Sequence, residues 1–227
     1  MNNKKRRLGV LILCTAICLG LMAFSASAAQ AVTWMVNGKN VESELSVEMP
    51  ITVENLPGTK EKHIVLLGTI EKTTFSMLCE SVEFQNAVLH PGGLATGNFL
   101  WSKCKVTLNG KEAPGCKPQE PIKLGEEGEA EKEEGKTDEE FKTVATLLFG
   151  EECSVGTELP LSGIYWMEET SGEWEVEQLS HTVREAEALA LVVGGLKLAN
   201  NSAFIDGSMK LEMKEKGESK KFSALAF

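Results

Sequence analysis

Short apolar segments with a two-residue alternation run through most of this chain, and they constrain its fold more than any other feature. Residues 45–53 place Leu45, Val47, Met49, Ile51 and Val53 on one face and mostly polar residues on the other, and residues 203–213 repeat the pattern. Because successive side chains of a β-strand point to opposite faces, the alternation predicts strands buried on one side. Pro50 has no N–H to donate, which predicts an edge strand for residues 45–53.

Further strands are expected wherever a short apolar run is bounded by turn-forming or charged residues. These segments are 33–36, 39–41, 63–70, 73–82, 94–108, 141–149, 159–167, 174–183 and 221–227. The dipeptides Asn37-Gly38 and Asn109-Gly110 are typical two-residue hairpin turns. Residues 183–193 contain good helix formers but also alternate, so we expect a strand there, with a helix as the alternative. The chain is therefore predicted to be all-β and antiparallel, a β-sandwich or an open barrel.

The first 31 residues have the three regions of a cleavable secretory signal. Residues 4–7 are Lys-Lys-Arg-Arg, an apolar run follows from 8 to 24, and small residues fill 25–31. Cleavage after Ala31 is preferred over cleavage after Ala28. An uncleaved membrane anchor is the alternative, but a run of about 17 residues is near the lower limit for spanning a bilayer. We expect a secreted or extracytoplasmic protein, not stably inserted in a membrane, with one domain over 32–227.

The net charge limits the partners of this chain. It is −10 for the whole sequence and becomes more negative, about −14, once the four basic residues of the signal are removed. A strongly acidic surface repels phosphate backbones, so nucleic acid is not an expected partner. Residues 125–140 carry nine acids against two lysines. Like-charge repulsion and low hydrophobicity predict a flexible, disordered acidic loop there, with an interaction or cation-binding segment as the alternative.

Four cysteines, Cys79, Cys104, Cys116 and Cys153, lie outside the signal. An even number in an exported chain indicates two disulfides. Three pairings are possible. A hairpin at residues 109–110 with a bulge at 114–115 would set Cys104 opposite Cys116, so we expect Cys104–Cys116 and Cys79–Cys153. No C-x-x-C pair is present and the spacings do not suit zinc, so no metal site is expected.

The sequence contains no recognisable catalytic constellation. It lacks the G-x-S-x-G nucleophile motif and the phosphate-binding loop, and His63, His90 and His181 are far apart. We therefore expect no enzyme activity and no cofactor. The candidate binding residues are Trp166 and Trp174 in segment 165–177, where aromatic residues lie among glutamates as in sugar-binding sites. The alternative for this segment is a strand with glutamates 173, 175 and 177 on its solvent face.

Several segments carry a resemblance to a known group of proteins. They are CESVEF at 79–84, GGLATGNFLWSKCKV at 92–106, LSHTV at 179–183, GGL and SMKL between 194 and 211, and the cysteines at 116 and 153. With these features the chain resembles uncharacterised exported β-rich proteins of high-GC soil bacteria. The resemblance covers most of residues 65–213. It implies a disulfide-containing β fold and an extracytoplasmic location, and it carries over no functional residue.

These observations favour a non-enzymatic exported binding or structural module, acting at the cell envelope or after release. A cell-wall glycan or another envelope protein is the candidate partner. The alternative is a carbohydrate-binding or carbohydrate-active protein that uses segment 165–177. A third hypothesis, a carrier of a small ligand, requires a suitable interior site that sequence does not reveal.

Overall fold

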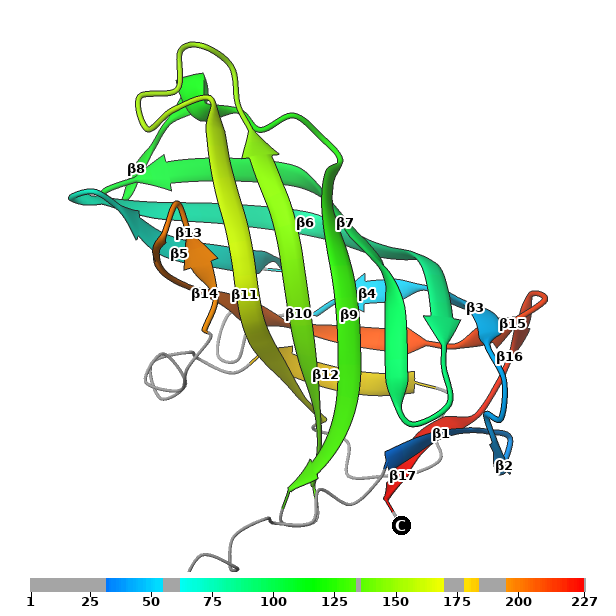
Figure 1. Cartoon of the computed structure of the whole chain (residues 1–227). Helices are drawn as coiled ribbons and strands as arrows, with labels where there is room; N and C mark the ends of the chain where they lie inside the picture. The colour runs from blue at the N-terminus through cyan, green and yellow to red at the C-terminus, as the bar shows by residue number, and fades with distance from the viewer. Residues whose placement is uncertain (1–31, 55–61, 134–135, 170–177, 184–194, 227) are drawn as a thin grey trace, which may run out of the picture. The chain divides into compact units, whose positions relative to one another are not determined.

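Figure 1 shows a computed structural model of the chain, which describes residues 32–54, 62–133, 136–169, 178–183 and 195–226. The signal at 1–31, the binding candidate Trp174 and residues 184–194 of the ambiguous strand lie outside the described residues.

Eight antiparallel strands close into a barrel. Each strand pairs with the next barrel strand along the chain, and the last pairs back with the first, so the barrel is an up-and-down meander. Its strands are β5 (Ile64–Ile70), β6 (Thr73–Leu89), β7 (Leu94–Leu108), β9 (Ile122–Glu133), β10 (Lys136–Leu148), β11 (Glu158–Glu169), β12 (Gln178–Val183) and β14 (Asn201–Glu212). The all-β antiparallel prediction is confirmed. Of the two predicted architectures, a sandwich and an open barrel, the structure has a barrel, and this barrel is closed. It is closed because β5 pairs with β14, which leaves neither strand as a free edge.

Alternating apolar side chains fill the barrel, as the two-residue pattern predicts. In β14, Ile205, Met209 and Leu211 are all at least 95% buried. In β6, Phe75 and Met77 have no exposed surface. An eight-stranded barrel is just wide enough for its side chains to fill the interior or to hold one small ligand. Polar groups on this inward face therefore need an explanation.

The predicted strand at 45–53 is divided in two at Pro50. β3 (Leu45–Met49) pairs with β6, whereas β4 (Ile51–Val53) pairs with β14. A continuous edge strand was the expectation. Proline cannot continue the ladder with an N–H, and here it marks the point at which the chain exchanges one partner strand for another.

Shorter strands add to the barrel. β1 (Val32–Val36), β2 (Lys39–Asn40) and β17 (Phe222–Ala226) form a separate three-stranded sheet. The other short elements are β8 (Lys111–Glu112), the 3₁₀ turn η1 (Pro114–Cys116), β13 (Lys197–Leu198), β15 (Lys214–Glu215) and β16 (Glu218–Ser219). The Trp34 indole of β1 donates a hydrogen bond to the Leu94 carbonyl of β7 at 3.0 Å. None of the described segments is a helix with the length and hydropathy to cross a bilayer.

The acidic segment 125–140 is a pair of strands, so the prediction of a disordered loop is wrong. Both β9 and β10 run through it and pair in register, with only residues 134–135 between them outside the description. Small residues make this possible, because Gly128 and Ala130 of β9 are buried while Glu127 and Glu129 are exposed. The high net charge of the segment obscures this alternation of small buried residues and exposed glutamates. The alternation is typical of a strand with one face toward solvent.

The disulfides also differ from the predicted pairing. The bonds are Cys79–Cys104, across β6 and β7, and Cys116–Cys153, from η1 to the loop between β10 and β11. The Asn109-Gly110 turn does pair Leu108 with Lys111, as expected. The hairpin, however, ends at Pro114, which has no N–H to extend the ladder, and the chain turns into η1. Cys116 therefore never lies opposite Cys104.

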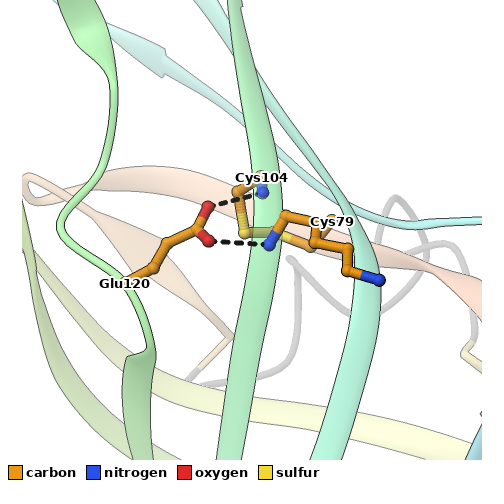
Figure 2. Close-up of a disulfide and its surroundings, with 4 residues drawn as sticks. Cys79, Cys104 and Glu120 are labelled. Carbon is orange, nitrogen blue, oxygen red and sulfur yellow. Dashed lines mark hydrogen bonds between the residues drawn. A yellow bond between two sulfur atoms is a disulfide. The ribbon is translucent and has the colours of Figure 1, made fainter.

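A glutamate side chain completes the hydrogen bonding of β7 beside the first disulfide. β7 pairs with β9 only as far as Trp101 and with β8 only from Thr107 onwards. In this gap the Glu120 carboxylate accepts hydrogen bonds from the backbone N–H groups of Lys103, at 2.8 Å, and Cys104, at 2.6 Å (Figure 2). Lys103 has a left-handed φ of 55°, which shifts the inward face of β7 from Trp101 to Cys104.

The two disulfides indicate an oxidising, extracytoplasmic environment.

Candidate functional site

A polar row crosses the apolar interior of the barrel. The strand register pairs Gly97 of β7 with Glu126 of β9, Glu126 with Thr143 of β10, and Thr143 with Gly163 of β11. Glu126 is 6% exposed and Thr143 is 1% exposed. Two polar side chains thus lie side by side in a row whose other two members have no side chain.

The polar atoms of this row have no hydrogen-bond partner among the described residues. Both carboxyl oxygens of Glu126 and the hydroxyl oxygen of Thr143 are buried in this state. Leaving such groups unpaired costs about 1–3 kcal/mol each. A native barrel that retains them either tolerates this cost or uses the groups to bind something else.

Aromatic rings border the row. A Cβ atom at Gly97 would lie 2.4 Å from Cζ of Phe84, and one at Gly128 would lie 2.6 Å from Cε1 of Phe141, so the edge of each ring covers a glycine. Gly97 is the pairing partner of Glu126, and Gly128 is two residues further along the same face of β9. The Phe141 ring in turn stacks on Tyr165 of β11, with centroids 5.5 Å apart. The carboxyl group therefore lies among aromatic side chains from β6, β10 and β11.

Burial controls the ionisation of Glu126. Loss of solvation raises the pKa of its carboxyl group from 4.5 to about 8, and the nearby hydroxyls of Thr143 and Tyr165 lower it only in part. Neither hydroxyl lies in hydrogen-bond geometry with the carboxyl oxygens. At neutral pH most molecules hold Glu126 as a neutral acid. Such a group can donate one hydrogen bond and accept others, or it can release its proton to the solvent and form an ion pair with a cation.

The close fit of Phe84 over Gly97 can be tested directly. Gly97→Ala forces the ring to move and is expected to destabilise the fold by about 1–3 kcal/mol through overpacking, measured by urea unfolding. Gly125→Ala on β9 is the matched control, since the nearest atom to its added Cβ is the Val144 carbonyl oxygen at 3.7 Å. Equal stability of the two variants would show that Phe84 does not occupy this space.

The structure describes only part of the predicted binding segment. Trp166 lies on β11, paired with Glu140 of β10, and its side chain is outside the described part of the structure, as is all of Trp174. Tyr165, from the same predicted segment, is 7% exposed and packs inside the barrel, so it is not part of an exposed sugar platform. The two disulfides include all four of the predicted disulfide cysteines, Cys79, Cys104, Cys116 and Cys153.

Glu126 was not among the residues singled out from the sequence, because it belongs to the acidic run. The available signal was its position. It shares the alternate face of β9 with Leu124, Gly128 and Ala130, whereas the other acids of the run up to Glu129 lie on the opposite face. An acid on the buried face of a strand is unusual and needs an explanation, whereas acids on the exposed face are expected.

Open grooves on the outer surface do not select one ligand class. The groove near the first disulfide has a volume of about 710 Å³. Its charged lining residues are Lys62, Glu80, Lys103, Lys105 and Glu112. The charges are mixed, and Lys105 already lies 4.0 Å from Glu80. Within the described ranges, no group of three or more His, Cys, Asp or Glu residues is arranged to hold a metal ion.

Comparisons of the chain with protein-family models, with curated proteins and with solved structures found no match.

Proposed function

We propose that this protein is an exported, non-enzymatic binding module that holds a small ligand inside its barrel, with Glu126 and Thr143 as the polar anchor. The observation that carries the proposal is the presence of three buried, unpartnered oxygen atoms on adjacent inward-facing residues of the described barrel. A ligand group that hydrogen-bonds to them would remove the cost of leaving them unpaired. Apolar sites with a few converging polar groups are typical of small-molecule binding.

The residues around the row support binding rather than catalysis. The described side chains that act on the pKa of Glu126 are the hydroxyls of Thr143 and Tyr165, and neither is a carboxylate or an imidazole that would complete an acid–base pair. Export is supported by the N-terminal signal pattern and by the two disulfides. The module would then meet its ligand at the cell envelope or in the medium.

Thr143→Val is the variant that tests this function, because it removes one polar anchor and keeps the shape. We expect the empty protein to become more stable by about 1 kcal/mol, since a buried hydroxyl without a partner is deleted. We also expect it to retain less ligand. The measurement is solvent extraction of protein purified from the producer's medium, with mass spectrometry of the extract, alongside urea unfolding.

Lys142→Met provides the control for that experiment. Lys142 is the neighbour of Thr143 on β10 and is exposed on the outer face, so its loss should leave the extracted ligand unchanged. A wild-type extract that holds no small molecule in stoichiometric amount, and no difference from Thr143→Val, would contradict the proposed function. A more stable variant with the same ligand content would make Thr143 a tolerated core residue only.

A further inference from the structure

The geometry points to an organic cation as the ligand: we propose that an ammonium group on a small apolar body binds at the Glu126–Thr143 row, with its charge against the Glu126 carboxylate. This inference rests on the proposed function and specifies the ligand class for the same site.

The first argument is the aromatic surroundings. Phe84 covers the glycine paired with Glu126, and Phe141 covers the next inward glycine of β9. The rings continue from Phe84 to Phe99 at 4.5 Å and from Phe99 to Phe141 at 5.9 Å between centroids. Aromatic faces attract cations, and several rings around one position are the usual protein recognition of alkylated ammonium groups. An acid among rings adds the counter-charge.

Among the described residues, no protein cation lies beside Glu126 on the inward face. The inward side chains near it, by strand register or against its paired glycine, come from β6, β7, β10 and β11 and contain no Lys, Arg or His. They are Phe84, Ala95, Phe99, Phe141, Thr143 and Tyr165. An ionised Glu126 would therefore have no cationic partner among these side chains, and a bound cation would neutralise its charge. A bound anion would meet no positive group among them.

Binding of a permanent cation releases a proton. The neutral acid Glu126 loses H⁺ to the solvent, the carboxylate stays beside the ammonium group, and the total charge is conserved. Because the pKa of the empty site is about 8, about 0.9 proton should leave per ligand bound at pH 7. Affinity should rise about tenfold per pH unit up to pH 8 and then level off.

The ligand must displace side-chain atoms to reach the row, since the carboxyl oxygens have essentially no exposed surface. Phe84 is 8% exposed and covers Gly97, so it is the ring that has to move on this side. Association should consequently be slow. Phe84→Leu, which removes the ring from Gly97, should accelerate it.

The test is calorimetric titration with three compounds of one shape and different charge, at pH 6, 7, 8 and 9. They are choline, its neutral carbon analogue 3,3-dimethylbutan-1-ol, and the anion 3,3-dimethylbutanoate. Buffers of different ionisation enthalpy report the number of protons released. We expect choline to bind at least tenfold more tightly than the alcohol at pH 8, with the proton release and pH dependence given above, and the anion to bind most weakly.

Variants separate the charge effect from a general loss of binding. Glu126→Gln should abolish the preference for choline over the alcohol, whereas Thr143→Val should keep it. Glu127→Gln is the matched control, since Glu127 is exposed on the other face of β9 and pairs in register with Lys142. His181→Gln controls for the one histidine of β12, which the register pairs with Met209. Unfolding curves and near-UV circular dichroism establish that each variant is folded.

The outcomes are distinguishable. Equal binding of choline and the alcohol without proton release, lost in Thr143→Val, would overturn the cation proposal and leave the proposed function standing. No binding of choline at millimolar concentration would overturn the cation proposal. If the solvent extract of the native protein also contained no ligand, the proposed function would fail with it.

Discussion

The free energy of unfolding is expected to fall by about 4 kcal/mol between pH 4.5 and pH 8 through Glu126 alone. The folded state raises the pKa of this carboxyl group to about 8, while the unfolded chain keeps it near 4.5. Between these values the folded protein binds more protons than the unfolded chain. Stability from this group is therefore fully present below pH 4.5 and is lost as the pH rises through 8.

Glu126→Gln isolates this effect, because an amide of the same shape does not ionise. The variant should match the wild type at pH 4.5 and exceed it in stability at pH 8, in urea titrations across this range. Glu127→Gln, one residue away on the exposed face, should follow the wild-type curve. Parallel pH profiles for Glu126→Gln and wild type would mean that the carboxyl group is ionised and solvated in the native protein.

Removal of the Cys116–Cys153 disulfide is expected to lower the free energy of unfolding by about 3–4 kcal/mol. The bond closes a loop of 37 residues, so its loss gives the unfolded chain more conformational freedom. Both sulfur atoms are in buried residues, which makes the double substitution Cys116→Ala with Cys153→Ala the suitable change. Denaturant unfolding under non-reducing conditions measures the loss.

The second disulfide provides the comparison. Cys79–Cys104 closes a loop of 25 residues and should have a similar effect on global stability. The local effects should differ, because Cys79 and Cys104 are held by strand pairing on both sides, whereas Cys153 is in a loop. Hydrogen exchange at Cys153 and Gly156, whose amides bond within that loop, should accelerate only when Cys116–Cys153 is removed. Equal protection in both double variants would contradict this distinction.

Local patterns in the sequence predicted strands well where apolar residues alternate. Residues 94–108 form β7 as expected, and Ile205, Met209, Leu211 and Met213 are buried together as predicted. The strand predictions were wrong for two segments. In residues 125–140 the nine acids outweighed the alternating small residues of β9 and led to the prediction of a loop. In residues 45–53 one strand was predicted, whereas Pro50 divides the segment between two partner strands. Disulfide pairing failed because it depends on where a hairpin stops, which Pro114 decided.

The site was harder to predict than the fold. Glu126, Thr143 and Tyr165 lie on three different strands, and their proximity follows from strand register rather than from sequence spacing. Gly97 and Gly128 are informative only once the rings above them are known. A tryptophan-based sugar site was the nearest hypothesis available from the sequence. It named Trp166 and Trp174 and stays a prediction, while Tyr165 of the same segment faces inward and is 7% exposed.

The pairing of β1 with β17 has a mechanical consequence. Val32 and Ala226 are directly opposite in this pair, so the chain enters and leaves the domain at neighbouring points (Figure 1). Tension applied to the two ends would separate β1 from β17 by breaking their hydrogen bonds one after another, rather than by shearing all of them at once. Apart from the hydrogen bond of Trp34 to Leu94, the eight strands of the barrel would carry none of that load until β1 and β17 had separated, so a tethered molecule would yield at its ends while its interior stayed closed.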